Sequence, residues 1–198
     1  MAASSTPAPS RRMPRAERRE QILEAATRVL ARNGFGATGL EQIAAEAGIT
    51  HVILYRHFAS KADLFRAVLE RAYTRLGDTM GTEHPGGSSL PALLAAATAD
   101  PDAFRLLFRH AVQEPDFRDI TDLVRGYSTV VAQRYLTQAI PDGPWQDWAT
   151  QVIPGFILDA VIAWLDVGRP DPEGAAARIG RAALALIEIA KDGAAAQE

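Results

Sequence analysis

The residues that say most about chemistry lie in the segment 38–65, where capping and apolar residues predict two short helices around a tight turn. Thr38 and the glutamate three residues later have the spacing of a capping box, and apolar residues then recur at helical intervals. Gly48 is placed to stop this first helix, and Thr50 to cap a second that runs to Phe58. Two helices this short bury little surface alone, so they need a third helix behind them. The resulting helix-turn-helix arrangement presents its second helix to a groove of DNA.

The four histidines give little support for catalysis or metal binding. They fall in separate predicted elements, and the chain contains neither a His-Glu-x-x-His motif nor a nucleophile-elbow serine. The chain has no cysteine, which excludes disulfides and thiolate metal sites. We therefore expect no enzymatic activity, no metal site and no cofactor.

Composition and periodicity predict an all-α protein. The chain has 198 residues, 47% of them hydrophobic, which is enough to bury a sizeable core. β-Branched residues are scattered, whereas Ala and Leu recur at helical spacing. No apolar run approaches the roughly 18 residues of a membrane span, and the first residues lack the hydrophobic core of a signal peptide. We expect a cytoplasmic protein without a membrane segment.

The pattern divides the chain into three parts. Residues 1–14 are rich in Ala, Ser and Pro and are expected to be disordered. Residues 15–76 form the predicted helix-turn-helix domain, and residues 77–198 a helical body. In the head, a helix is predicted at 16–33, and another begins after the cap at Ser60 and runs toward Leu76. A loop is predicted at 81–89. The helices predicted in the body are 90–99, 101–113, 116–140, 144–167 and 172–191. Pro154 should kink or divide the helix that contains it.

The distribution of charge separates the head from the body. Residues 1–76 contain 12 Arg and Lys against 7 Asp and Glu, whereas residues 77–198 contain 9 against 17. A basic head on an acidic body favours DNA binding by the head alone. A chance fluctuation of surface charge is the other explanation.

The segment around the predicted turn resembles the tetracycline-repressor (TetR) family of one-component transcriptional regulators. The resemblance covers roughly residues 15–73 and rests on placed residues of the family pattern: Gly34-Phe35, Thr38, Ile43-Ala44, Ala47-Gly48-Ile49-Thr50, Leu54-Tyr55, Phe58, Lys61 and Leu64. The body resembles the family only in being all-helical and of suitable length. The resemblance implies an N-terminal helix-turn-helix head and a C-terminal body that binds a ligand and dimerises.

The resemblance implies a DNA-binding role for seven residues: Thr38, Thr50, His51, Val52, Tyr55, Arg56 and Lys61. Thr38 would bind a phosphate or only cap its helix; Tyr55 would reach the DNA backbone or pack in the core. Lys61 would bind a phosphate or be a solvated lysine. Val52 and Ile53 stand where many relatives carry a small residue followed by Thr or Ser, so these apolar groups either contact thymine methyls or pack inward.

The resemblance also implies an effector cavity between helices of the body and a dimer interface on the last two long helices. The expected effector-binding residues are Phe104, Phe108, Arg109, Tyr127, Trp148, Phe156 and Asp159. Ordinary core packing explains the same aromatic pattern. Small residues on the last two helices permit close approach between protomers, but also internal packing.

We therefore expect a homodimer that binds a palindromic operator in double-stranded DNA and is released, most simply as a repressor, by a small apolar or amphipathic effector. The alternative is a DNA-binding dimer without a small-molecule ligand, controlled by a protein partner or by its own concentration. A fully packed body without a cavity would favour the alternative.

Overall fold

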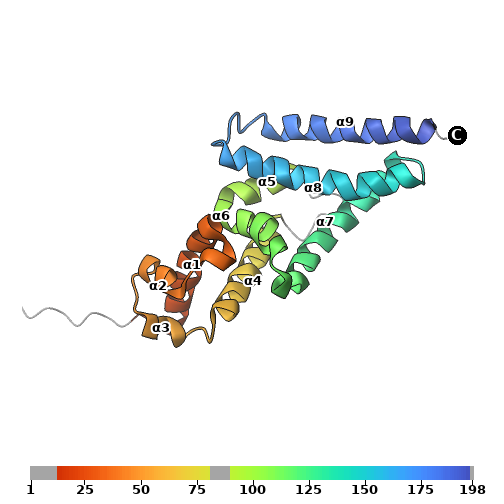
Figure 1. Ribbon diagram of the computed structural model, residues 1–198. Coiled ribbons are helices and arrows are strands. Elements are labelled where there is room, and N and C mark those ends of the chain that lie inside the picture. The colour runs from red at the N-terminus through yellow and green to blue at the C-terminus, as the bar shows by residue number, and fades with distance from the viewer. Residues whose placement is uncertain (1–12, 81–89, 197–198) are drawn as a thin grey trace, which may run out of the picture.

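The computed structural model describes residues 13–80 and 90–196, except for the side chains of residues 124, 125 and 127–132. Every regular element in this part of the chain is a helix, which confirms the predicted all-α fold (Figure 1). The elements are α1 (Arg15–Ala37), α2 (Leu40–Glu46), α3 (His51–Tyr55), α4 (Lys61–Met80), α5 (Leu90–Ala99), α6 (Pro101–Arg105), the π-helical η1 (Leu106–His110), the 3₁₀ segments η2 (Ala111–Gln113) and η3 (Pro115–Phe117), α7 (Arg118–Ala139), α8 (Pro144–Asp166) and α9 (Ala175–Ala195).

The first four helices form the head, with α2 and α3 set at the end of the molecule farthest from α9 (Figure 1). Gly34 interrupts α1 with φ 75° and ψ 173°, so the expected break after residue 33 is present, although helical turns resume beyond it. Gly48 takes φ 64° between α2 and α3, where a glycine avoids the steric cost of a left-handed backbone.

The predicted capping box at Thr38 is wrong. The hydroxyl of Thr38 donates to the carbonyl oxygen of Gly34 at 2.7 Å, so Thr38 closes the end of α1. The N-cap of α2 is Gly39, whose backbone N–H donates to Oε1 of Gln42 at 3.0 Å. Gly34 interrupts α1, and the Thr38 hydroxyl bonds the Gly34 carbonyl four residues earlier instead of capping α2.

A single hydrophobic core joins the head to the body. It contains Ile22, Leu30, Leu54, Phe58, Leu64 and Phe65 from the head, together with Leu106, Leu107 and Phe117 from the segment before α7. The rings of Phe35, Phe65 and Phe117 contact one another with centroid distances of 4.6–5.4 Å. The proposed boundary at residue 76 therefore lies within α4 and beside a shared core.

The body follows the predicted order of helices, with two differences: the helix expected at 101–113 is split, and the helix that contains Pro154 is not divided. The expected helix 101–113 is divided into α6, η1 and η2. The helix that contains Pro154 is undivided from Pro144 to Asp166. Helices α8 and α9 run side by side along one edge of the molecule, and α7 packs against α8 (Figure 1). The predicted loop 81–89 and residues 1–12 of the predicted disordered arm lie outside the described residues.

The membrane expectation needs one correction. Within the described residues, α8 has the length and the mean hydropathy, 1.5 over 18 residues, that a membrane span requires. A core helix of a soluble protein meets the same criteria, and α8 contacts α7, α9 and α5. Length and composition are thus weak evidence for a span.

Candidate DNA-binding surface and body pocket

Helix α3 turns one face into the core and the other to solvent. Leu54 has no exposed surface and Phe58, just after the helix, is 1% exposed, so both are core residues as predicted. Val52 is 64% exposed and Tyr55 49% exposed. Ile53 is only half-buried, and its N–H is capped by the Thr50 hydroxyl at 3.4 Å. The two apolar residues therefore differ in exposure: Val52 is exposed to solvent, and Ile53 is half-buried.

The imidazole of His51 is held between two neighbours. Its ring meets the Tyr55 ring edge-on with centroids 4.6 Å apart, and its Nε2 lies 3.5 Å from Oε1 of Glu41 in α2. This Nε2 is shielded from solvent and makes no hydrogen bond within the described residues. His51 thus orients Tyr55 and links α2 to α3, a position that the sequence alone did not predict.

Thr38 and Lys61 approach the same corner of the head. Thr38 is 3% exposed, and its hydroxyl hydrogen is already used by Gly34. The ammonium of Lys61 donates to the carbonyl oxygen of Gly36 at 3.4 Å and lies 4.3 Å from the centre of the Phe35 ring. Lys61 is half-buried, so it is fixed against the head rather than extended into water.

Arginines of α1 border α3. The guanidinium of Arg19 lies 4.4 Å from the centre of the Phe58 ring, and Arg18 donates to Gln21 at 2.8 Å. Burial, and then the positive charges of Arg15, Arg19 and Arg18, lower the pKa of His57 below its ordinary value. Arg56 ends α3 and is exposed. The exposed end of the head is thus basic.

Contacts that sequence reasoning missed hold α2 in place. Arg28 and Arg32 of α1 both bind the carboxylate of Glu46 at 2.8 Å, and these hydrogen bonds lower the pKa of Glu46. The amide of Gln21 donates to the carbonyl oxygen of Ala47 at 2.8 Å, which fixes the turn. Helical spacing gives no signal for such contacts, because the partners are 14 to 26 residues apart.

The expected effector-binding residues do not gather at one place. Phe104 and Phe108 contact each other with centroids 4.6 Å apart, near α4 and α5. Trp148 and Phe156 pack in a separate core between α7, α8 and α9. Two of the expected residues are charged: Arg109 pairs with Asp166 at 2.8 Å, and Asp159 is exposed. Tyr127 lies in α7, and its side chain is outside the described residues.

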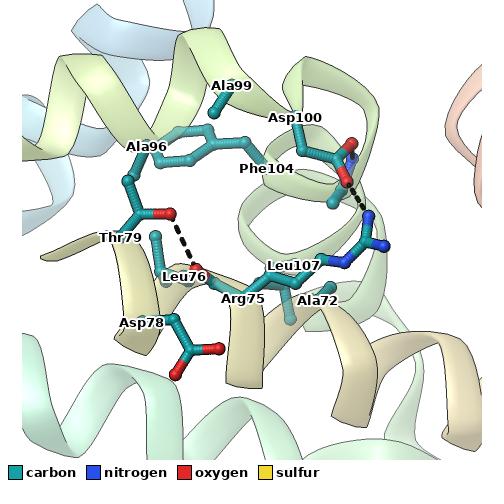
Figure 2. A pocket seen from close by; sticks show the side chains of 11 residues that line it. Ala72, Arg75, Leu76, Asp78, Thr79, Ala96, Ala99, Asp100, Phe104 and Leu107 are labelled. Atoms are coloured by element: carbon teal, nitrogen blue, oxygen red, sulfur yellow. Dashed lines mark hydrogen bonds and ion pairs between the residues drawn. The ribbon is translucent and has the colours of Figure 1, made fainter.

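A pocket of about 240 Å³ lies between α4, α5 and α6 (Figure 2). Among the described residues that line it, Phe104 is the one that was expected to bind an effector. The lining comprises Ala72, Arg75, Leu76, Asp78, Thr79, Ala96, Ala99, Asp100, Ala103, Phe104 and Leu107. Helical periodicity did not reveal this pocket, because α4 was assigned to the head alone.

These features define a helix-turn-helix protein with a helical body. Residues 22–68 match the family model for bacterial regulatory proteins of the tetR family. The chain is 48% identical over 60 residues to the HTH-type transcriptional activator FasR of Mycolicibacterium smegmatis, a match that covers 30% of this chain and 27% of that protein. It is 28% identical to the HTH-type transcriptional repressor SCO4008 of Streptomyces coelicolor, over 73% of this chain and 76% of that protein.

The fold agrees with these matches. A TetR-like transcriptional regulator from Rhodococcus sp. RHA1 superposes with a TM-score of 0.72 and 23% identity, covering 93% of this chain and 99% of that one. The matched part of the chain spans only 27% to 41% of the lengths of the first three curated relatives. Residues 22–68 therefore form a DNA-binding domain of the tetR-family type, as the resemblance predicted, and the whole chain has the fold of TetR-like regulators.

Proposed function

We propose that this protein is a homodimeric regulator that binds a palindromic operator through α3 and is released by a small effector bound in its body. The observation that carries the DNA-binding part is the geometry of α3. Buried Leu54 anchors the helix, while Val52, Tyr55 and Arg56 extend into solvent beside the arginines of α1. An exposed recognition helix flanked by cations suits a DNA groove lined by phosphates.

The proposed contacts differ in kind. Val52 offers methyl groups to thymine, and Arg56 offers a guanidinium to guanine or to a phosphate. Tyr55, Lys61 and the N-terminus of α3 at Thr50 and His51 would bind the backbone. Thr38 is buried with its hydroxyl hydrogen engaged by Gly34, so we assign it the task of closing the end of α1.

The proposed dimer uses the outer face of α8 and α9. Leu184 and Ile189 of α9 are 59% and 53% exposed. The two helices lie at the end of the molecule opposite α3 (Figure 1), so a two-fold contact there leaves both heads free. Recognition helices of such a dimer would meet half-sites one helical turn of DNA apart, roughly 34–36 Å, or a multiple of this spacing.

We favour regulation by a small ligand over regulation without one, because a pocket lies between α4, α5 and α6. Helix α4 lines the pocket and also belongs to the head core, so a ligand there contacts the same rigid element that carries Phe65 and Leu64. Release follows if the ligand binds better to the conformation that does not fit DNA. The named relatives include an activator and a repressor, and we propose repression as the simpler mode.

The deciding experiment is selection of random duplex DNA by the purified full chain at two salt concentrations. A palindrome with steep salt dependence is the expected result. No preferred sequence from a folded dimer would overturn the DNA-binding proposal. For the interface, Leu184→Glu should yield a monomer in sedimentation experiments, whereas Leu123→Glu, at a leucine 56% exposed on α7, should remain dimeric.

A further inference from the structure

The ring nitrogen of His51 that lies farther from the backbone is turned toward α2. The side chain is 39% exposed, yet its Nε2 is shielded from solvent and makes no hydrogen bond within the described residues. This nitrogen lies 3.5 Å from Oε1 of Glu41. A side chain that reads a base must bring a polar atom to a base edge in the groove, and the Nε2 of His51 is directed elsewhere.

The carboxylate of Glu41 lies between the start of α2 and α3. Its Oε1 faces His51, and its Oε2 lies so close to Gly39 that an added Cβ there would come within 3.0 Å of it. An ionised carboxylate only accepts hydrogen bonds, so a ring hydrogen of His51 belongs on the nitrogen that faces it. The missing side chain at Gly39 thus leaves room for the carboxylate that keeps Nε2 turned toward α2.

The ring of His51 also supports Tyr55, one helical turn further along α3. Residues four apart lie on the same face of a helix, and the two rings meet with centroids 4.6 Å apart and planes at 86°. Aromatic rings favour this edge-to-face arrangement. Tyr55 is 49% exposed, and an exposed side chain without such a contact exchanges among staggered rotamers. The ring of His51 therefore restricts the orientation of the Tyr55 phenol before DNA binds.

We propose that His51 is a positioning residue of the recognition helix: its ring holds Tyr55 in the orientation that contacts the DNA backbone, and its imidazole reads no base. The proposal rests on the DNA-binding function proposed above and gives His51 an indirect role in it. Fixing Tyr55 in advance reduces the side-chain entropy that is lost on binding. Because His51 acts through Tyr55, loss of the imidazole costs no more affinity than loss of the Tyr55 side chain.

The first test measures the contribution of the Tyr55 hydroxyl in two backgrounds. Fluorescence anisotropy gives the affinity of the full chain for the operator recovered by DNA selection. Tyr55→Phe keeps the ring and should weaken binding about threefold to tenfold, the worth of one hydrogen bond. In a His51→Ala background, which is itself weakened, adding Tyr55→Phe should cost less than about twofold. Losses that simply multiply in the double variant would overturn the proposal.

Lys61→Ala is the control background for this comparison. Lys61 contacts Phe35 and the carbonyl oxygen of Gly36, so it does not support Tyr55. Tyr55→Phe should keep its full effect on operator affinity in this background. A reduced effect here as well would show that the Tyr55 contact is lost with any weakening of the complex, which contradicts a specific role of His51.

Two further variants separate the ring of His51 from its nitrogens. His51→Phe keeps an aromatic ring beside Tyr55 without a polar atom, so operator affinity should stay within about twofold of the parent value. His51→Gln keeps a polar side chain without a ring and should behave like His51→Ala. All three variants retain the backbone N–H at the start of α3. The reverse order, with affinity kept by His51→Gln and lost by His51→Phe, would mean that the imidazole binds DNA directly.

Repeating the DNA selection with His51→Ala tests for base readout. Contacts to the DNA backbone position a protein without selecting a base. The variant should therefore recover the parent operator with the same base preference at each position, although with lower affinity. A changed base at one position of each half-site would make His51 a reader and refute its positioning role.

Nuclear magnetic resonance of the DNA-free full chain tests the ring contact by itself. The ring resonances of labelled Tyr55 should move in His51→Ala, whereas those of Tyr73, which packs against the core of the head, should not. Unmoved Tyr55 resonances would disprove the contact. If the parent chain selects no operator, the DNA-binding function fails and the role of His51 with it. If the operator is bound but the losses multiply, the DNA-binding function stands and the positioning role is wrong.

Discussion

The ammonium of Lys61 lies 4.3 Å from the centre of the Phe35 ring, at the corner where α1 ends and α4 begins. The same ammonium donates to the carbonyl oxygen of Gly36 at 3.4 Å. Phe35 packs on Phe65 and Phe117, so Lys61 rests on the aromatic cluster that joins head and body. One lysine therefore has both a structural contact and a position suited to a phosphate.

Lys61→Ala should separate these two roles. Loss of the contact with Phe35 should lower the free energy of unfolding by about 0.5–1 kcal/mol, the range for a cation and a ring that remain accessible to solvent. If Lys61 also binds a phosphate, operator affinity should fall and the slope of log affinity against log salt should decrease by about 1. Denaturant unfolding and fluorescence anisotropy measure the two effects. Lys61→Arg is the control, and an unchanged salt slope in Lys61→Ala would make the role purely structural.

Val52 is predicted to determine base preference. Val52→Ser should change the preferred base at one position of each half-site, because a good contact to one base is worth about 1–3 kcal/mol of discrimination. Its stability should change by no more than about 0.5 kcal/mol, since the side chain is 64% exposed. Repeating the DNA selection with the variant measures the preference.

Ile53→Ala is the matched comparison for Val52. Ile53 is half-buried, whereas Val52 is exposed. We expect this variant to lose stability while keeping the base preference of the parent protein. A changed base preference in Ile53→Ala, with none in Val52→Ser, would reverse the assignment of the two residues.

Gly34 should resist substitution because of its backbone conformation. Its φ of 75° and ψ of 173° belong to a region that is essentially restricted to glycine. Gly34→Ala should therefore cost about 1–3 kcal/mol of stability. Gly36→Ala is the control two residues away, where an added Cβ meets nothing within 4 Å. The control should be neutral or slightly stabilising in thermal unfolding, and equal losses in both variants would contradict the backbone explanation.

Asp166 should make the body sensitive to acid. Burial opposes the charge of Asp166, but hydrogen bonds from Arg105 at 2.9 Å and contact with Arg109 at 2.8 Å outweigh it and hold the pKa of the carboxyl below its ordinary value. A lowered pKa in the folded state stabilises the protein above the unfolded-state pKa of about 3.9. This stabilisation disappears as the pH falls through the folded-state pKa.

Urea unfolding of Asp166→Asn tests this dependence. The variant should be less stable than the parent at pH 7, and the difference should shrink toward pH 3. Asp122→Asn, at an exposed residue of α7, should show no comparable pH-dependent difference. A difference for Asp166→Asn that stays constant from pH 7 to pH 3 would show that the charge is unimportant.

Local sequence determined the elements of the head. Thr50 caps α3, Leu54 and Phe58 are buried, and Gly48 makes the turn, all as their spacing predicted. These features depend on neighbours within one or two helical turns, so periodicity and capping rules are sufficient to find them. The family followed from the same residues, because the match lies within the head.

Only the tertiary structure decided which side chains are available for binding. The sequence could not distinguish Val52 from Ile53, because the face of a five-residue helix depends on what packs behind it. It misplaced the role of Thr38, because spacing alone does not show that the backbone break at Gly34 leaves a carbonyl four residues earlier as the partner of the hydroxyl. It also could not locate the pocket, since Arg75 meets Glu20 and Asp100 across separations of 55 and 25 residues. Such contacts arise from the packing of helices against one another, and no local pattern records them.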